Sequence, residues 1–110
     1  MLVREDLPAA QQVVQSCHAA IEAARFLFPP DSPHPHLIVC SVGDEPALWQ
    51  RLHRLQRHGI RFRAFFEPDR ANELTALATE PVCGPTRRVF RNLRLLTPEP
   101  LPASSKGGEP

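Results

Sequence analysis

The chain has 110 residues, of which 42% are hydrophobic and 23% are charged, and its formal net charge is +1. These are ordinary globular values, and the length suits one domain around a single core. They argue against a fibrous or membrane-spanning class, since no run approaches the ~18 apolar residues of a spanning helix. The stretch MLVREDLPAAQQ also lacks the layout of a signal peptide, so we expect a cytoplasmic protein.

The first helix is predicted from Ala10 to Phe28. Its apolar residues recur every three or four positions, which is typical of one buried face, and they are Val14, Cys17, Ile21, Ala24 and Phe28. A short strand is expected before it, in residues 2–6, and Asp6 is placed to cap the helix. Residues 36–42, HLIVCSV, form a continuous apolar run that is typical of a central strand.

A second helix is predicted between a cap at Asp44 and a stop at Gly59. One stripe of this helix carries Leu48, Leu52 and Leu55. Residues 60–66 alternate in polarity as the next strand does, and we expect the two strands that flank this helix to be parallel neighbours joined by a right-handed crossover.

The rest of the chain predicts a strand in residues 73–81, a short helix in 84–92 and a last strand in 93–96. We therefore expect one α/β domain over residues 1–97, with a small mixed sheet covered by helices. Residues 98–110 are rich in Pro, Gly and Ser and have almost nothing to bury, so a disordered tail is expected there.

Metal and cofactor chemistry has little support in the sequence. The three cysteines Cys17, Cys40 and Cys83 are widely spaced, which predicts neither a disulfide framework nor a zinc site, and we expect each to be a small buried residue. His34 and His36 have a ligand-like spacing but no third ligand near them in the sequence. No glycine-rich phosphate loop is present. We therefore expect no metal and no cofactor.

Charged residues are unevenly spread. Arginines fall in two groups, which are Arg51, Arg54, Arg57, Arg61 and Arg63, and then Arg87, Arg88, Arg91 and Arg94. Side by side, these groups would make a patch of guanidinium forks suited to phosphates, and the alternative is a solvated arginine-rich surface. Between them lie the acids Glu67, Asp69 and Glu73, which are either turn chemistry or part of a site.

The first helix carries a second stripe beside its apolar one. At ~100° per residue, the stripe consists of Gln11, Gln15, His18, Glu22 and Arg25. A histidine transfers protons near neutral pH, and glutamines can bind a sugar or a base edge. The alternative is that this stripe is simply the solvated side of an amphipathic helix.

These patterns, in this order along the chain, resemble the peptidyl-tRNA hydrolase family of archaeal and eukaryotic type, type II. The family's R-x-D-L start and Q-x-x-H-A step are matched, and LTALATEP is similar to a family strand that begins with threonine. The matched residues are Arg4, Asp6, Leu7, Gln15, His18, Ala19, Thr75 and Pro81. The resemblance covers residues 2–97.

The resemblance implies a single domain with a mixed four-stranded sheet, and metal-independent hydrolysis of the ester between a peptide and its tRNA. Two positions depart from the family. Gln11 stands where the family has a lysine, and the loop that supplies the family's catalytic carboxylate is shortened here. A carboxylate is retained as Glu67 or Asp69. If the fold matches, one of these approaches Gln15 and His18.

Ester hydrolysis needs a base for water, a donor to the developing oxyanion and a grip on the tRNA. The resemblance assigns the base to Glu67 or Asp69 and the donor to His18 or Thr75. Substrate binding is assigned to Gln11, Gln15, Arg51, Arg54, Arg87 and Arg88. The alternative is an inactive RNA- or protein-binding module on the same fold. Trp49, a quarter turn from the leucine stripe, is either core or a contact with a partner, a second copy of the chain included.

Overall fold

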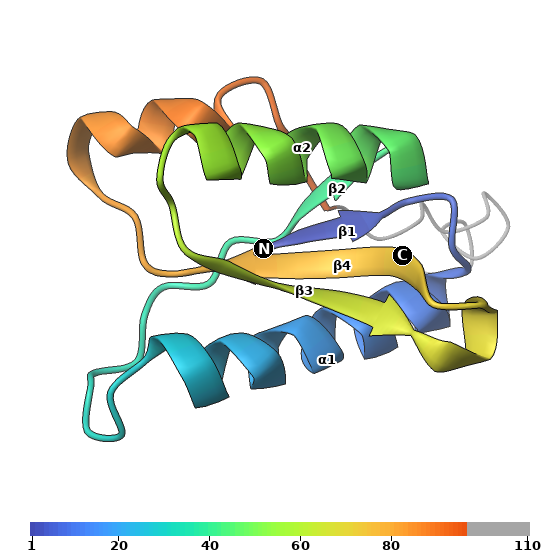
Figure 1. The fold of residues 1–110 in the computed structure, drawn as a ribbon, viewed down its shortest axis with the longest axis horizontal. Coiled ribbons are helices and arrows are strands. Elements are labelled where there is room, and N and C mark those ends of the chain that lie inside the picture. Colours follow the sequence, from blue (N-terminus) through green and yellow to red (C-terminus); the bar gives the residue numbers. More distant parts are fainter. Residues whose placement is uncertain (97–110) are drawn as a thin grey trace, which may run out of the picture.

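A computed structural model describes residues 1–96 of the chain. One mixed sheet contains β1 (Leu2–Arg4), β2 (Cys40–Val42), β3 (Phe62–Glu67), β4 (Glu73–Thr79) and β5 (Arg94–Leu95), in the order β3-β4-β1-β2-β5. Helix α1 (Ala9–Leu27) covers one face, and α2 (Glu45–Arg57) with the 3-10 helix η2 (Gly84–Phe90) covers the other (Figure 1). A short 3-10 turn, η1 (Pro68–Arg70), joins β3 to β4. Within the described residues, neither helix is long and apolar enough to cross a bilayer.

The prediction of a single α/β domain with a mixed sheet is confirmed, with two corrections to the sheet. It has five strands where four were implied, because the short β5 pairs with β2. The strands that flank α2 are also not neighbours, since β4 and β1 lie between β3 and β2. The parallel neighbours are β1 and β2, while β3 pairs antiparallel with β4. Pairing across the short η1 turn closes a much smaller loop than the crossover would. The tail expected at 98–110 lies outside the described residues.

Helix α2 follows the prediction closely. Its N-cap is Asp44, whose Oδ1 accepts a hydrogen bond from the Ala47 backbone N at 3.0 Å. The chain leaves the helix at Gly59, whose φ of 68° lies in the left-handed region that glycine tolerates. The leucine stripe packs on β1, β2 and β4 in the larger of two apolar clusters, with Leu48, Leu52 and Leu55 all buried.

Helix α1 presents a different face to the sheet from the predicted one. The buried residues are Gln15, Ala19 and Ala23, and the alanines pack against Ala76 and Ala78 of β4. Small side chains on both surfaces let the helix approach the sheet closely. Four of the five residues of the expected face are on the outside: Ile21 is 55% exposed, and Val14, Cys17 and Ala24 are also exposed. The fifth, Phe28, follows the helix and packs partly buried against the cluster under α1. Of the three cysteines, only Cys40 is buried.

The predicted strand at 36–42 is shorter than expected. Only Cys40–Val42 is a strand, and Leu37 and Ile38 are 74% and 50% exposed. The partner β1 has three residues, which pair one to one with those of β2, so the ladder has no further partner strand to continue against. The apolar run predicted a central strand correctly and its length wrongly.

Candidate functional site

One end of the molecule gathers the residues that the sequence singled out. Strands β1 and β3 end there, β4 begins there after η1, and α1 and α2 both start there, at the right of Figure 1. The prediction that β3 ends at the rim where α1 begins is therefore confirmed. Glu67 is the last residue of β3, and Gln11 and Gln15 lie in the first two turns of α1.

A register shift in the sheet turns Thr75 toward α1. Phe65 pairs with Ala76, but the next residue, Phe66, pairs with Leu74, so Thr75 is an extra residue on β4. Ala76 packs in the cluster under α1 and Leu74 in the cluster under α2. Strict alternation from Ala76 would direct Thr75 to the α2 side. The bulge instead places Thr75 and Ala76 on the same side, as bulges beside functional sites often do.

Gln15 is the centre of a buried hydrogen-bond network. Its side chain is fully buried, and its Oε1 accepts a hydrogen bond from the Thr75 hydroxyl at 2.6 Å. Its Nε2 donates to Glu67 Oε1 at 2.8 Å and to Gln11 Oε1 at 3.2 Å. Every polar atom of the amide is thus satisfied, which fixes which end of the amide faces Glu67. The alternative that this stripe of α1 is solvated is wrong for Gln15.

The Glu67 carboxylate is held in its ionised form. The hydrogen bond from Gln15 is the main cause that lowers the pKa of Glu67 below its ordinary value of 4.5, and the Asp69 backbone N, at 3.3 Å from Oε2, adds to it. Smaller favourable contributions come from the charges of His18 and Arg70, and desolvation opposes them. Glu67 is therefore an anion with no strong ion pair, hydrogen-bonded by a neutral amide and by the turn.

The acidic bend forms a tight turn at the end of β3. Pro68–Arg70 form the 3-10 turn, and the Asn72 backbone N donates to the Glu67 carbonyl at 2.9 Å to close it. Ala71 and Asn72 adopt left-handed φ values of 55° and 60°. Asp69 is exposed, and it contributes its backbone N to Glu67. The turn interpretation is therefore confirmed, and the site interpretation stays a prediction.

His18 stacks on Phe65 beside this network. The two rings are nearly parallel, with an interplanar angle of 7° and centroids 4.3 Å apart. The carbonyl of Phe65 lies 3.3 Å from the Thr75 hydroxyl. The stack fixes the imidazole on the α1 side of β3, the side on which Glu67 meets Gln15. His18, Gln15 and Glu67 are thus brought together as the sequence predicted.

A second network, which the sequence did not predict, consists of carboxylates that surround the Arg4 guanidinium. Arg4 is 5% exposed, and its guanidinium binds both Asp6 carboxylate oxygens at 2.9 Å and Glu73 Oε1 at 2.9 Å. These hydrogen bonds hold the pKa values of both acids below their ordinary range. Asp6 therefore binds Arg4 and does not cap α1 as predicted, since α1 has no side-chain cap.

Glu73 differs from Glu67 through its partners. Arg4 and Arg70 both lie against its carboxylate, the second at 3.5 Å, so Glu73 is neutralised by two guanidinium groups. Glu45 extends the network from the α2 side, since its Oε2 accepts from the Leu74 backbone N at 3.0 Å and from Trp49 Nε1 at 3.2 Å. The sequence singled out Arg4 only through the R-x-D-L match, two residues before Asp6, and that match did not indicate that its guanidinium would be buried.

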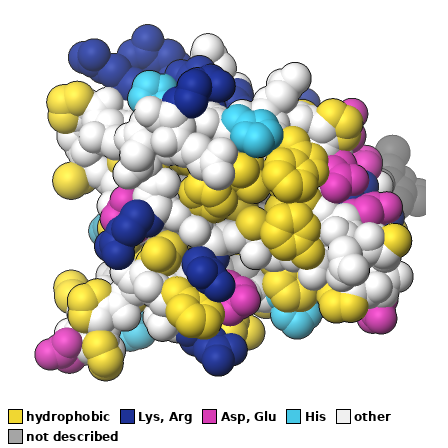
Figure 2. Space-filling view, viewed as in Figure 1, with side chains coloured by type: hydrophobic (Ala, Val, Ile, Leu, Met, Phe, Trp, Pro, Cys, Tyr) yellow, Lys and Arg dark blue, Asp and Glu magenta, His cyan; other side chains and the backbone are white. Residues whose placement is uncertain are grey.

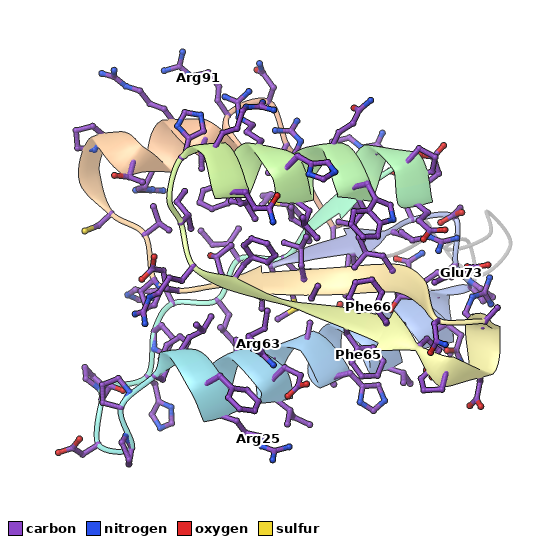
Figure 3. All side chains as sticks on the ribbon, in the orientation of Figure 1. Arg25, Arg63, Phe65, Phe66, Glu73 and Arg91 are labelled. Carbon is purple, nitrogen blue, oxygen red and sulfur yellow. The ribbon has the colours of Figure 1, made fainter. Side chains whose placement is uncertain are left out.

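The arginines that the sequence assigned to substrate binding do not lie near Glu67 and Asp69. Arg51 and Arg54 are on α2 and Arg87 and Arg88 on η2, on the sheet face opposite α1. In Figure 3, Arg91 and Glu73 lie at different ends of the molecule. Two arginines of the predicted groups are neutralised elsewhere, because Arg61 pairs with Glu80 and Arg94 with Glu5. Residues 1–96 contain no group of three or more His, Cys, Asp or Glu side chains arranged to hold a metal ion.

The fold and the site define a small α/β protein with a carboxylate, an amide and a hydroxyl linked at the carboxyl end of its outer strand. No protein-family model matches the chain, and no curated protein matches it.

Proposed function

We propose that this chain is a divergent member of the type II peptidyl-tRNA hydrolase family, which hydrolyses the ester between a peptide and its tRNA. The observation that carries the proposal is the Glu67–Gln15–Thr75 network. Its members come from the Q-x-x-H-A step, from the acidic loop, which keeps a carboxylate but is shorter than the family's, and from the strand that begins with threonine. They are 52 and 60 residues apart in sequence, so their meeting was not dictated by local structure.

Glu67 is the base in this proposal, and it accepts a proton from the water that attacks the ester carbonyl. Gln15 orients the carboxylate, and Thr75 holds Gln15, because the Thr75 hydroxyl is buried and donates its proton to the amide. The donor to the developing oxyanion is therefore assigned to His18, which is only partly buried. Asp69 contributes its backbone N to Glu67.

A base with a lowered pKa is always ionised at neutral pH but is a weak proton acceptor. The cation that the family's lysine would supply is absent, because Gln11 stands there and bonds to Gln15. Both features favour a slow enzyme over an efficient one. We therefore expect turnover that is measurable at high enzyme concentration and that falls as Glu67 becomes protonated below pH 4.5.

One observation favours a second candidate, a catalytically inactive RNA-binding module. Arginines on α2, on η2 and directly after η2 gather on one face, and in residues 1–96 none of them forms an ion pair; they are Arg51, Arg54, Arg57, Arg87, Arg88 and Arg91. Figure 2 shows Lys and Arg side chains together at the upper left, over this part of the fold. Unpaired guanidinium groups suit phosphates, and such binding weakens as salt rises.

Release of peptide from diacetyl-lysyl-tRNA tests the proposal. Glu67→Gln keeps the side-chain shape and removes the base, and we expect a loss of about 10²- to 10⁴-fold in kcat. Glu80→Gln is the matched control, because Glu80 pairs with Arg61 at the other end of β4, and it should leave the rate unchanged. No turnover by the wild-type protein, with tRNA binding intact and sensitive to salt, would reject the enzyme in favour of the binding module.

A further inference from the structure

Strand β3 is one of the two outer strands of the sheet, and among the described residues its second edge has no partner strand. This edge runs across the face shown in Figure 2, where hydrophobic side chains gather in the middle of the view. In Figure 3, Phe66 lies above the strand, and Phe65 and Arg63 lie below it. The edge therefore presents aromatic side chains on both of its sides and a cation on the side of Phe65.

Aromatic rings meet on the α2 side of this edge. Phe66 is 41% exposed, and its ring centroid lies 5.9 Å from that of Trp49. His53 also stacks on Trp49, with ring centroids 5.9 Å apart and an interplanar angle of 29°. Trp49 is partly buried and packs against the larger apolar cluster, so it lies at the edge of the core, with its ring next to those of Phe66 and His53.

Cations lie on the α1 side of the same edge. The guanidinium of Arg63 lies 4.1 Å from the centroid of the Phe26 ring, and that of Arg25 lies 5.5 Å from it. Phe26 is 53% exposed, and within residues 1–96 neither arginine has a carboxylate partner. A shallow depression of about 460 Å³ follows the strand between these groups, lined by Phe62 through Phe66 and by one acid, Glu22.

We propose that this edge binds a short single-stranded segment of RNA, namely the unpaired 3′ end that carries the ester. Bases stack on Phe66 and the Trp49–His53 pair, and phosphates meet Arg63 and Arg25. The inference rests on the proposed function and deepens it, because it describes how the ester reaches Glu67, the residue after Phe66 in the strand. Residues 63 to 67 span about 13 Å at ~3.3 Å per residue, room for about four stacked nucleotides at ~3.4 Å each.

Nucleic acid fits this edge better than an added peptide strand does. Aromatic faces accept any base, and adjacent cations accept its phosphates, which is how many proteins bind single strands. A peptide that extends the sheet binds mainly through backbone hydrogen bonds, which would leave the aromatic rings and the arginines beside this edge without a partner. The arginines of α2 and η2 lie elsewhere and would bind the double-stranded part without stacking.

Trp49 makes a direct test possible. It is the only tryptophan of the chain, which has no tyrosine, so the intrinsic fluorescence near 340 nm comes from this one ring. An eight-nucleotide single-stranded RNA should quench it in a saturable titration, and a blunt RNA duplex should not. Phe66→Leu keeps an apolar side chain at this exposed site but removes the ring, and it should weaken binding by about tenfold.

Charge variants test the second half of the surface. Arg63→Gln should weaken binding and reduce the dependence of log K on log salt by about 0.7, the value for one phosphate on a single strand. Arg61→Gln is the matched control, because Arg61 already pairs with Glu80. It should change neither the affinity nor the salt dependence.

The fluorescence titration and the esterase assay together separate failure of the RNA-binding surface from failure of the esterase. Saturable quenching that Phe66→Leu weakens, in a protein that releases no peptide from its tRNA, would support the RNA surface and reject the esterase. Absence of quenching, equal affinity of Phe66→Leu and wild type, or equal quenching by the duplex would overturn the surface whatever the esterase assay shows. Quenching by an apolar peptide and not by RNA would also overturn it.

Discussion

Thr75→Val removes one hydroxyl from the buried network and keeps the shape of the side chain. In the wild type this hydroxyl donates to Gln15 Oε1 at 2.6 Å, and both side chains are fully buried. A buried acceptor without its donor costs about 1–3 kcal/mol, and the extra buried methyl group of valine returns up to ~0.8 kcal/mol. We expect a net loss of about 1–2 kcal/mol in the free energy of unfolding, which for a domain of this size lowers Tm by about 4–16 °C.

Thermal unfolding followed by circular dichroism measures this loss, and Thr79→Val is the control. The Thr79 hydroxyl donates to the Glu80 carbonyl at the half-buried end of the same strand, where water can replace it, so we expect a change within about 0.5 kcal/mol. Thr75→Val should also loosen Gln15 and let the pKa of Glu67 rise toward 4.5, which a carboxyl NMR titration would show. An unchanged Tm, or an equal loss in Thr79→Val, would refute the assignment of Thr75 as the residue that holds Gln15.

Two further predictions concern the acid network and the orientation of α1. Because Arg4 lowers the pKa of Asp6 and of Glu73 in the folded state, stability should be fully present above their ordinary values of 3.8 and 4.5 and decline as the pH falls through the lowered ones. Urea unfolding from pH 7 down to about pH 2 measures this decline, and Arg4→Met should flatten it; an unchanged slope would contradict the network. Ala19→Leu should overpack the helix–sheet contact and cost about 1–3 kcal/mol, while Ile21→Ser, on the exposed face, should cost less than about 0.5 kcal/mol. Thermal unfolding that ranks these two variants in the opposite order would mean that the predicted face is the buried one.

The site was predictable as a set of residue types and only in part as a geometry. Glu67, Gln15 and His18 were expected to meet, because the resemblance supplied the order of elements and β3 had to end near the start of α1. The role of Thr75 depends on the bulge in β4, where the register between β3 and β4 shifts by one residue. The burial of Arg4 depends on partners up to 70 residues away. Neither feature leaves a periodic trace in the sequence.

Local signals determined α2 without help from the rest of the chain. Asp44 caps it, Gly59 ends it, and its large leucines leave only one face that can be buried. Helix α1 offered an apolar and a polar stripe, and the face that is buried, Gln15, Ala19 and Ala23, shares only Gln15 with either of them. Only the sheet selected this face, because Ala76 and Ala78 offer a flat surface on which small residues pack closely, and because Thr75 and Glu67 satisfy the amide of Gln15 once it is buried there.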